Sequence, residues 1–464
     1  MVETIPGLSS TPDRRSDRLL KILGVGFGVA VAVGNTIGAG IVRTPGDIAS
    51  VLPKLGLFFA VWFGGALYAL LGAFQLAELG AAIPRSGGQY NFSRRALGEY
   101  AGFIVGWSDW LSTCGTLAAV GIVIGEYSGK LFPVLDGHVK VIAVGVILFF
   151  AAVQWKSLRF GSGVQNVTSL LKAILFTALV AACFVIPPHT RYASGATPSG
   201  VAPQALMVPL GWALFAALVV GLQATIYTYD GWDGVIYFGD EVRDPGTNIP
   251  RGITASVISI FAIYLMINAA LVYVLPINEI AGNNFALGAA AERVFGAHGG
   301  TIFRSVMVLA LLSSINALQL MGTRVIYAMS RDGLFFRRVA RVNRGGTPAL
   351  ALALSAAIGI VFAVFSFERV IAMLAFFFVA NYTISFISLF ILRTREPELE
   401  RPYRAWGYPW TTAAALVGSL AFLAGAIVSD RQNSRLTLIA LAISYPMYRL
   451  LKWVAARGCS AQPA

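Results

Sequence analysis

The stretch Gly34-Asn-Thr-Ile-Gly-Ala-Gly40 interrupts the first apolar segment of this sequence. Three glycines in these seven residues, with Pro45 following, make a continuous helix costly here. The sixth apolar segment carries Tyr227-Thr-Tyr-Asp-Gly-Trp-Asp233, again with polar groups around a glycine. Helices that break at membrane depth persist only where they line a cavity or are buried in protein. Two such stretches therefore predict a site between two broken helices.

The composition indicates that the chain folds in a membrane. Of its 464 residues 57% are hydrophobic and 12% are charged, whereas a soluble domain carries about 25% charged residues. A membrane-spanning helix needs roughly 20 apolar residues, so we expect about twelve spans in one all-α domain over 21–455, with tails at 1–20 and 456–464. The expected spans are 21–50, 55–82, 99–129, 138–155, 163–187, 208–239, 252–275, 301–328, 348–366, 370–392, 409–429 and 435–455.

The two interruptions occupy corresponding places in the order of spans. Five spans counted from each break give one group over about 21–187 and another over about 208–392, followed by helices 11 and 12 at about 409–455. Because five is odd, the second group would be inverted in the membrane relative to the first. Such an inverted repeat is typical of transporters with a site near the bilayer midplane. The alternative is that the glycines of the first stretch merely let two helices pack closely.

Loop charges predict the orientation. Twelve spans place both termini on one side, and the tails and loops of that side hold 23 of the 35 Lys and Arg residues, against 9 in the opposite loops. Positively charged loops stay in the cytoplasm. We therefore expect a multi-pass protein of the plasma membrane, such as a bacterial inner membrane, with both termini cytoplasmic. The net charge of +13 then reflects orientation, and we expect no nucleic-acid partner.

The sequence carries no motif for enzyme chemistry. It lacks GxxxxGK[ST], GxSxG and HExxH. Its three histidines lack ligand spacing, and its three cysteines form neither a CxxC pair nor a disulfide framework. We expect no enzymatic activity, no cofactor and no metal.

Unwound helix ends offer binding groups for both charges of a zwitterion. The N–H groups near Gly38, Ala39 and Gly40 would start the second half of helix 1 and favour a carboxylate. Carbonyl groups near Thr36 and in the range 227–230 would face an ammonium group. Opposite charges held this close describe the head of an α-amino acid, so an amino acid and the lipid bilayer are the expected partners.

Ionisable and aromatic side chains inside the spans have competing interpretations. Lys172 in span 5 faces a partner or a wet cavity, or it extends to the cytoplasmic surface. Asp230 reinforces the ammonium site, carries a proton, or only caps the second half-helix. Trp232 is either a candidate lid over the substrate or a residue packed in the core. Arg43 pairs with Asp230 or Asp233, or faces the outer vestibule.

Several longer motifs occur in a recognisable order. They are 34–45 (GNTIGAGIVRTP), 77–90 (AELGAAIPRSGGQY), 229–232 with 240–251 (YDGW, DEVRDPGTNIPR), 330–334 (SRDGL) with 342–343 (VN) and 347–348 (TP), and 395–409 (REPELERPYRAWGYP). Together they resemble the amino acid, polyamine and organocation (APC) transporter superfamily. The L-type, sodium-independent branch is most similar, because 164–166 (VQN) and Lys172 fall where that branch carries its helix 5 lysine.

The resemblance implies a leucine-transporter-like fold that works by alternating access. It also implies that Lys172 takes the place of a sodium ion. Ala39 departs from a serine expected in some relatives, which removes a hydroxyl but leaves the backbone contacts. The loop 129–138 has no cysteine for a disulfide-linked heavy chain, so we expect no such partner. The implied substrate-binding residues are Thr36, Ile37, Gly38, Ala39, Gly40, Tyr227, Thr228 and Asp230, with Trp232 as a gate.

The expected function is sodium-independent amino-acid transport, by exchange or by proton coupling, with a neutral amino acid preferred. One alternative is a sodium-coupled transporter of the same fold for cationic amino acids or polyamines. The other is an amino-acid sensor that does not transport.

Overall fold

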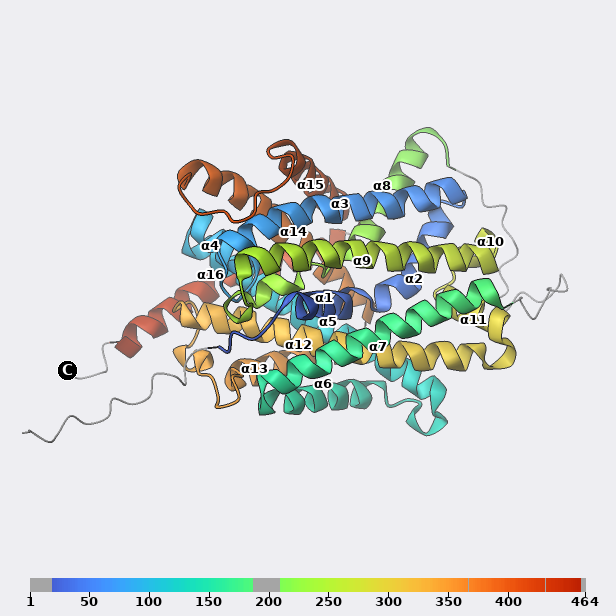
Figure 1. Ribbon diagram of the computed structural model, residues 1–464, viewed down its shortest axis with the longest axis horizontal. Coiled ribbons are helices and arrows are strands. Elements are labelled where there is room, and N and C mark those ends of the chain that lie inside the picture. The colour runs from blue at the N-terminus through green and yellow to red at the C-terminus, as the bar shows by residue number, and fades with distance from the viewer. Residues whose placement is uncertain (1–18, 187–208, 366, 430, 460–464) are drawn as a thin grey trace, which may run out of the picture.

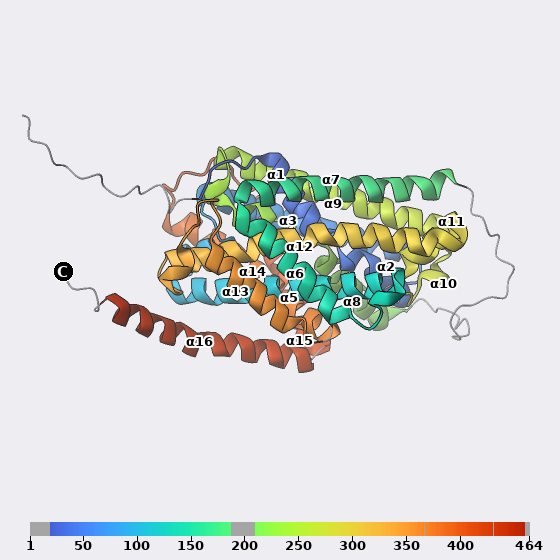
Figure 2. The same cartoon turned by 90° about the horizontal axis from the view of Figure 1, so that it is seen from below.

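The chain folds into a bundle of long helices. The computed structural model describes residues 19–186, 209–365, 367–429 and 431–459. Within these ranges the regular elements are helices, and two isolated bridges, Leu23 to Val242 and Ser86 to Phe238, are the only β pairing. Figures 1 and 2 show that most long helices run along the long axis of the molecule, with the connections gathered at its two ends.

Shorter helices lie toward both ends of the molecule. Figure 1 places α4 toward the end marked C, and α2, α10 and α11 toward the opposite end. The helices are α1 Val25–Thr36, α2 Ala39–Val51, α3 Leu55–Ala82, α4 Gln89–Leu97, α5 Glu99–Leu131, α6 Val139–Lys156, α7 Leu158–Val185, α8 Gly211–Tyr229, α9 Pro245–Val274, α10 Ile277–Ile280, α11 Ala286–Phe295, α12 Gly299–Arg331, α13 Ala349–Phe362, α14 Phe367–Arg395, α15 Trp410–Ser429 and α16 Arg431–Cys459.

The described part contains nine helices long and apolar enough to cross a membrane, or ten if the bent pair α1 and α2 forms one span. The protein is therefore a multi-pass membrane protein. The expected total of twelve and the inverted relation between the two halves stay predictions. The expected ninth span corresponds to α13, whose 14 residues are short for a complete crossing.

Burial separates a central group of helices from an outer ring. In α5, 89% of the residues in the most apolar stretch are buried, and the share is 61% both in the span that contains α12 and over residues 376–395 of α14. The corresponding shares in α6, α8 and α15 are 22% or less. Large apolar side chains on these outer helices, such as Phe149, Phe215 and Leu420, are exposed. Since lipid replaces water around such faces, exposure of this kind is expected of a membrane bundle.

Both predicted interruptions are present. Helix α1 ends at Thr36, α2 begins at Ala39, and the two axes differ by 51°. Helix α8 ends at Tyr229, and the chain continues as two short 3-10 helices, η3 Gly234–Tyr237 and η4 Gly239–Glu241. The second part of span 6 is thus 3-10 rather than the expected α-helix, after a left-handed turn at Gly231 with φ +106°.

The two interruptions lie against each other. A Cβ atom at Gly231 would lie 2.3 Å from Asn35 Nδ2 and 3.0 Å from Thr36 Oγ1. Only glycine permits both this approach and the positive φ. Gly231 therefore allows the end of α8 to lie against the end of α1.

Three short helices, α4, α10 and α11, were not expected from the sequence. Helix α4 follows a turn in which Gly87 and Gly88 have φ values of +115° and +66°. Helix α11 fills the connection between α9 and α12. Most of the expected N-terminal tail (1–18), the end of the C-terminal tail (460–464) and the connection 187–208 lie outside the described residues.

Candidate functional site

The side chain of Lys172 reaches across from α7 to the break between α1 and α2. Its Nζ donates hydrogen bonds to the carbonyl oxygens of Gly34 at 2.9 Å and Ile37 at 2.6 Å, and to Ser314 Oγ at 3.0 Å. The residue is completely buried. Lys172 therefore points into the bundle and does not extend to the cytoplasmic surface, which was the alternative interpretation.

This ammonium group lies at the C-terminal end of α1. The last carbonyl groups of a helix lack intrahelical partners and carry the negative end of its dipole. Ser314 on α12 adds a second donor to the Gly34 oxygen, at 2.6 Å. The residues Lys172 and Ser314 thus satisfy the orphan carbonyls that the unwinding of helix 1 exposes.

The opposite pole, at the start of α2, is left without a side-chain cap. Gly38 is the N-cap residue, and among the described residues no side-chain cap hydrogen bond is present there. Ala39 begins α2, although its side chain lies outside the described set. The first N–H groups of a helix point away from it and favour negative charge. An anion is the ligand that this end of the helix suits.

Helix α8 supports α2 from the side. A Cβ at Gly40 would lie 3.4 Å from the Thr228 side chain, at van der Waals contact. The Thr228 hydroxyl lies 2.7 Å from Thr44 Oγ1 and also donates to the Ala224 oxygen at 2.8 Å. The side chain of Thr228 therefore joins the two broken spans, while its carbonyl group belongs to the end of α8.

One tyrosine that was not predicted connects the carbonyl groups of the two breaks. Tyr264 Oη, on α9, lies 2.7 Å from the Thr36 oxygen and 3.0 Å from the Thr228 oxygen, so its proton is shared between them. The neighbouring Tyr227 oxygen accepts a bond from the Asp230 N–H at 3.2 Å. Each carbonyl has two lone pairs and retains capacity to accept a further donor.

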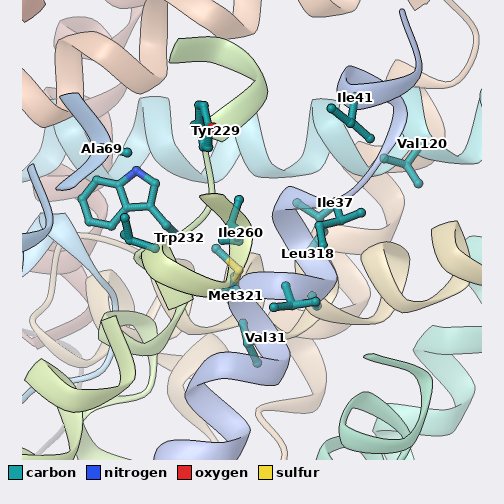
Figure 3. Close-up of a cluster of buried hydrophobic side chains, with 14 of the residues drawn as sticks. Val31, Ile37, Ile41, Ala69, Val120, Tyr229, Trp232, Ile260, Leu318 and Met321 are labelled. Carbon is teal, nitrogen blue, oxygen red and sulfur yellow. The ribbon is translucent and has the colours of Figure 1, made fainter. Parts of the chain in front are cut away.

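Asp230 lies where α8 ends and is held by α14. Its Oδ1 accepts a hydrogen bond from Tyr382 Oη at 2.7 Å. The Tyr382 ring stacks on Trp232, with centroids 5.4 Å apart and an angle of 12°. Trp232 is 2% exposed, and Figure 3 shows its indole beside Ala69 of α3. Trp232 is packed in the core in this conformation, at the edge of the second break.

The sequence leaves open whether Arg43 pairs with Asp230 or Asp233 or faces the outer vestibule. Arg43 lies 3.4 Å from Glu126 Oε2, and both side chains are partly exposed. Asp233 accepts instead from Gln89 Nε2, at 3.1 Å. The arginine therefore forms an ion pair with α5 and not with either of the two aspartates.

Two buried hydroxyl groups near the breaks have no hydrogen-bond partner among the described residues. They are Thr36 Oγ1 and Tyr229 Oη. A buried polar group without a partner costs about 1–3 kcal/mol, so such groups are retained where something else completes them. Figure 3 shows apolar side chains surrounding the same region, among them Ile37, Ile41 and Val120. The surroundings are apolar, with polar groups concentrated on the breaks.

A second polar cluster explains why residue 34 is a glycine. A Cβ there would lie 2.1 Å from Gln165 Nε2 and 2.9 Å from the hydroxyl oxygens of Ser169 and Ser313. Gln165 and Ser169 also bond to the Ala30 oxygen at 3.1 and 2.6 Å. Gly34 is thus required by close approach rather than by flexibility alone.

Comparison with known proteins places this geometry in context. The family described as Amino acid permease matches residues 28–447. The serine/threonine exchanger SteT of Bacillus subtilis is 26% identical over 94% of this chain and 97% of its own length. The human b(0,+)-type amino acid transporter 1 is 26% identical over 84% of this chain and 80% of its own. The mouse large neutral amino acids transporter small subunit 2 is 24% identical, with shares of 86% and 76%.

Proposed function

The chain belongs to the amino acid permease family, and from that premise we propose that it transports a neutral amino acid without sodium. The relatives are amino-acid transporters and exchangers, which supports amino-acid transport. In this proposal the substrate binds between the α1–α2 break and the end of α8, and the protein acts as an exchanger or with proton coupling. Both termini lie in the cytoplasm.

The observation that carries sodium independence is the position of Lys172 Nζ. It lies within 3.0 Å of two helix 1 carbonyl oxygens and one α12 hydroxyl. Unwound carbonyl groups of broken helices are the groups that coordinate a sodium ion in coupled transporters. In this proposal the Lys172 side chain takes the place of the ion and donates to the same carbonyl groups.

The poles of the two broken spans support binding of an α-amino acid. The uncapped start of α2 favours the carboxylate. In this proposal the carbonyl groups of Thr36, Tyr227 and Thr228 face the ammonium group of the substrate. The Asp230 carboxylate is nearby in the chain. The implied set of Thr36, Ile37, Gly38, Ala39, Gly40, Tyr227, Thr228 and Asp230 remains our proposal for the substrate contacts.

The apolar surroundings support a neutral side chain. Ile37, Ile41 and Val120 lie around the first break, and Leu318 and Met321 contribute from α12 (Figure 3). Burying a charged side chain among these groups would require a partner that they cannot provide. The relatives named for serine, threonine or large neutral amino acids agree with this choice.

Alternating access follows if the ligand joins two moving parts. A substrate that contacts both the α1–α2 break and α8 stabilises the closed conformation only by its higher affinity for that conformation. The stack of Trp232 on Tyr382 lies beside the second break and is a candidate gate. Opening then requires these two rings to separate on one side of the substrate.

Exchange in proteoliposomes tests the proposal. Vesicles that contain the purified protein are loaded with an unlabelled amino acid, and the uptake of a labelled one is measured against a panel of unlabelled competitors. We expect counterflow that neutral amino acids inhibit and polyamines do not. Binding to purified protein without any flux would favour an amino-acid sensor instead.

A further inference from the structure

Basic side chains from two distant segments gather where α6 meets α7. Leu158 N donates to the Gly345 oxygen at 3.0 Å, and Asn343 Nδ2 donates to the Trp155 oxygen at 2.7 Å. These bonds fix the α6–α7 turn on the connection between α12 and α13. The resulting basic patch consists of six exposed side chains, Lys156, Arg159, Arg337, Arg338, Arg341 and Arg344.

The basic patch has no acidic counterpart on the segments that form it. The sequence contains no Asp or Glu between Asp136 and Asp230, and none between Asp332 and Glu368. Asp332 itself forms ion pairs with Arg85 and Arg94, each with a nitrogen-to-oxygen distance of 2.7 Å. Within the described residues none of the six patch side chains forms an ion pair. Their charge is therefore available to a partner outside the chain.

Exposed aromatic rings accompany these charges. Trp155 and Phe160 are each 50% exposed and Phe336 is 49% exposed. Lys156 Nζ lies 5.7 Å from the centre of the Phe160 ring. Tryptophan concentrates at the level of the lipid headgroups. Trp155, with the two exposed phenylalanines beside it, therefore places the basic patch near the plane of the phosphates rather than out in the aqueous phase.

We propose that the basic patch binds the phosphate headgroups of anionic phospholipids in the leaflet that it faces. Basic clusters next to a membrane are attracted to anionic lipids by about 1 kcal/mol per Lys or Arg. Six basic side chains that lie at the depth of the headgroups, with no acidic side chain paired to them among the described residues, match a layer of lipid phosphates better than a soluble partner. The inference depends on the multi-pass membrane fold and is independent of which amino acid the protein transports.

Lipid selectivity of the full chain is the test. The protein is placed in nanodiscs of phosphatidylglycerol and phosphatidylcholine, and the lipids retained on extraction are measured by native mass spectrometry. We expect the wild type to retain phosphatidylglycerol preferentially. In the variant Lys156→Gln/Arg159→Gln/Arg341→Gln/Arg344→Gln the preference should fall about tenfold or more. Replacing the three arginines by lysine should preserve it.

A charge-matched control distinguishes specific lipid binding by the basic patch from a general effect of the protein's net charge. The variant Lys54→Gln/Lys130→Gln/Arg243→Gln/Arg251→Gln removes the same number of exposed charges outside the patch and should keep the preference. If both variants lose it equally, or if the patch variant keeps it, the proposal is overturned. Should the fourfold variant fail to fold, Lys156→Gln/Arg159→Gln and Arg341→Gln/Arg344→Gln are measured separately, and each should lose part of the preference.

Discussion

Lys172 Nζ lies 2.6 Å from the carbonyl oxygen of Ile37, at the point where the first membrane helix breaks. This contact joins the Lys172 side chain to the backbone that is proposed to hold the substrate. It also explains why a lysine can stay buried, since the carbonyl dipoles of the helix end and Ser314 replace its hydration shell. Changes at this position should therefore affect transport directly.

Replacement of Lys172 by alanine should abolish or strongly slow uptake while the protein still reaches the membrane. The Gly34 oxygen would keep the Ser314 hydroxyl as a donor. The Ile37 oxygen would lose its charged donor, and a buried group left unpaired costs about 1–3 kcal/mol. Initial uptake rates and membrane abundance measure the two effects. Exposed Lys54 serves as the control, and Lys54→Ala should transport normally. Near-normal rates in Lys172→Ala would remove the lysine from the mechanism.

Gly34→Ala should be far more damaging than Gly26→Ala, although both positions lie in α1. The new methyl group at residue 34 would lie within 2.9 Å of three polar side chain atoms, whereas nothing lies within 4 Å of a Cβ at Gly26. Overpacking of this kind costs about 1–3 kcal/mol. Thermal unfolding and uptake should both be impaired in the first variant only. Equal behaviour of the two variants would contradict the close approach described at Gly34.

Tyr264→Phe should weaken substrate affinity by about tenfold, as expected for losing one hydrogen bond of roughly 1.4 kcal/mol at two carbonyl groups. The hydroxyl aligns the Thr36 and Thr228 oxygens. The measurement is the KM for uptake, which should rise while the protein remains folded. Tyr273 lies on the same helix and is 62% exposed, so Tyr273→Phe is the matched control. An unchanged KM in Tyr264→Phe would argue against a role for these oxygens.

The ion pair between Arg324 and Glu241 should be sensitive to removal of one partner. Arg324 Nε lies 3.0 Å from Glu241 Oε1, and both side chains are almost completely buried. Arg324→Met would leave a buried carboxylate unpaired and should destabilise by about 3–5 kcal/mol. Removing both charges, in Arg324→Met/Glu241→Gln, should recover part of that loss in a thermal unfolding experiment.

The exposed pair between Arg95 and Glu396 provides the comparison. These side chains are 40% and 32% exposed, and such pairs contribute about 0–1 kcal/mol. Arg95→Met should therefore shift the unfolding temperature little. A shift as large as that of Arg324→Met would show that burial does not decide the difference.

The sequence allowed the two breaks and Lys172 to be identified because each is an anomaly within an apolar run. Glycine and polar residues are costly in a membrane helix, and a lysine there demands a partner. The partners themselves could not be deduced in the same way. Ser314 and Tyr264 lie on helices far along the chain, and single hydroxyl residues in apolar helices are too common to indicate a contact.

Details of backbone geometry were also beyond prediction. The residues after Gly231 form 3-10 turns, and Gly231 itself lies in close contact with Asn35, a contact between residues far apart in the sequence. Arg43 pairs with Glu126 rather than with Asp230, and that choice depends on how α2 and α5 pack. Pairing of this kind is a tertiary property that local sequence does not encode.

Uptake by the purified protein with and without sodium is the most direct test of the proposed site. Labelled neutral amino acid is offered to preloaded proteoliposomes in sodium chloride and in choline chloride of equal concentration. With Lys172 Nζ on the oxygens of Gly34, Ile37 and Ser314, the initial rates should be equal in the two salts. Uptake that requires sodium, or no exchange of any common amino acid, would contradict the proposed function.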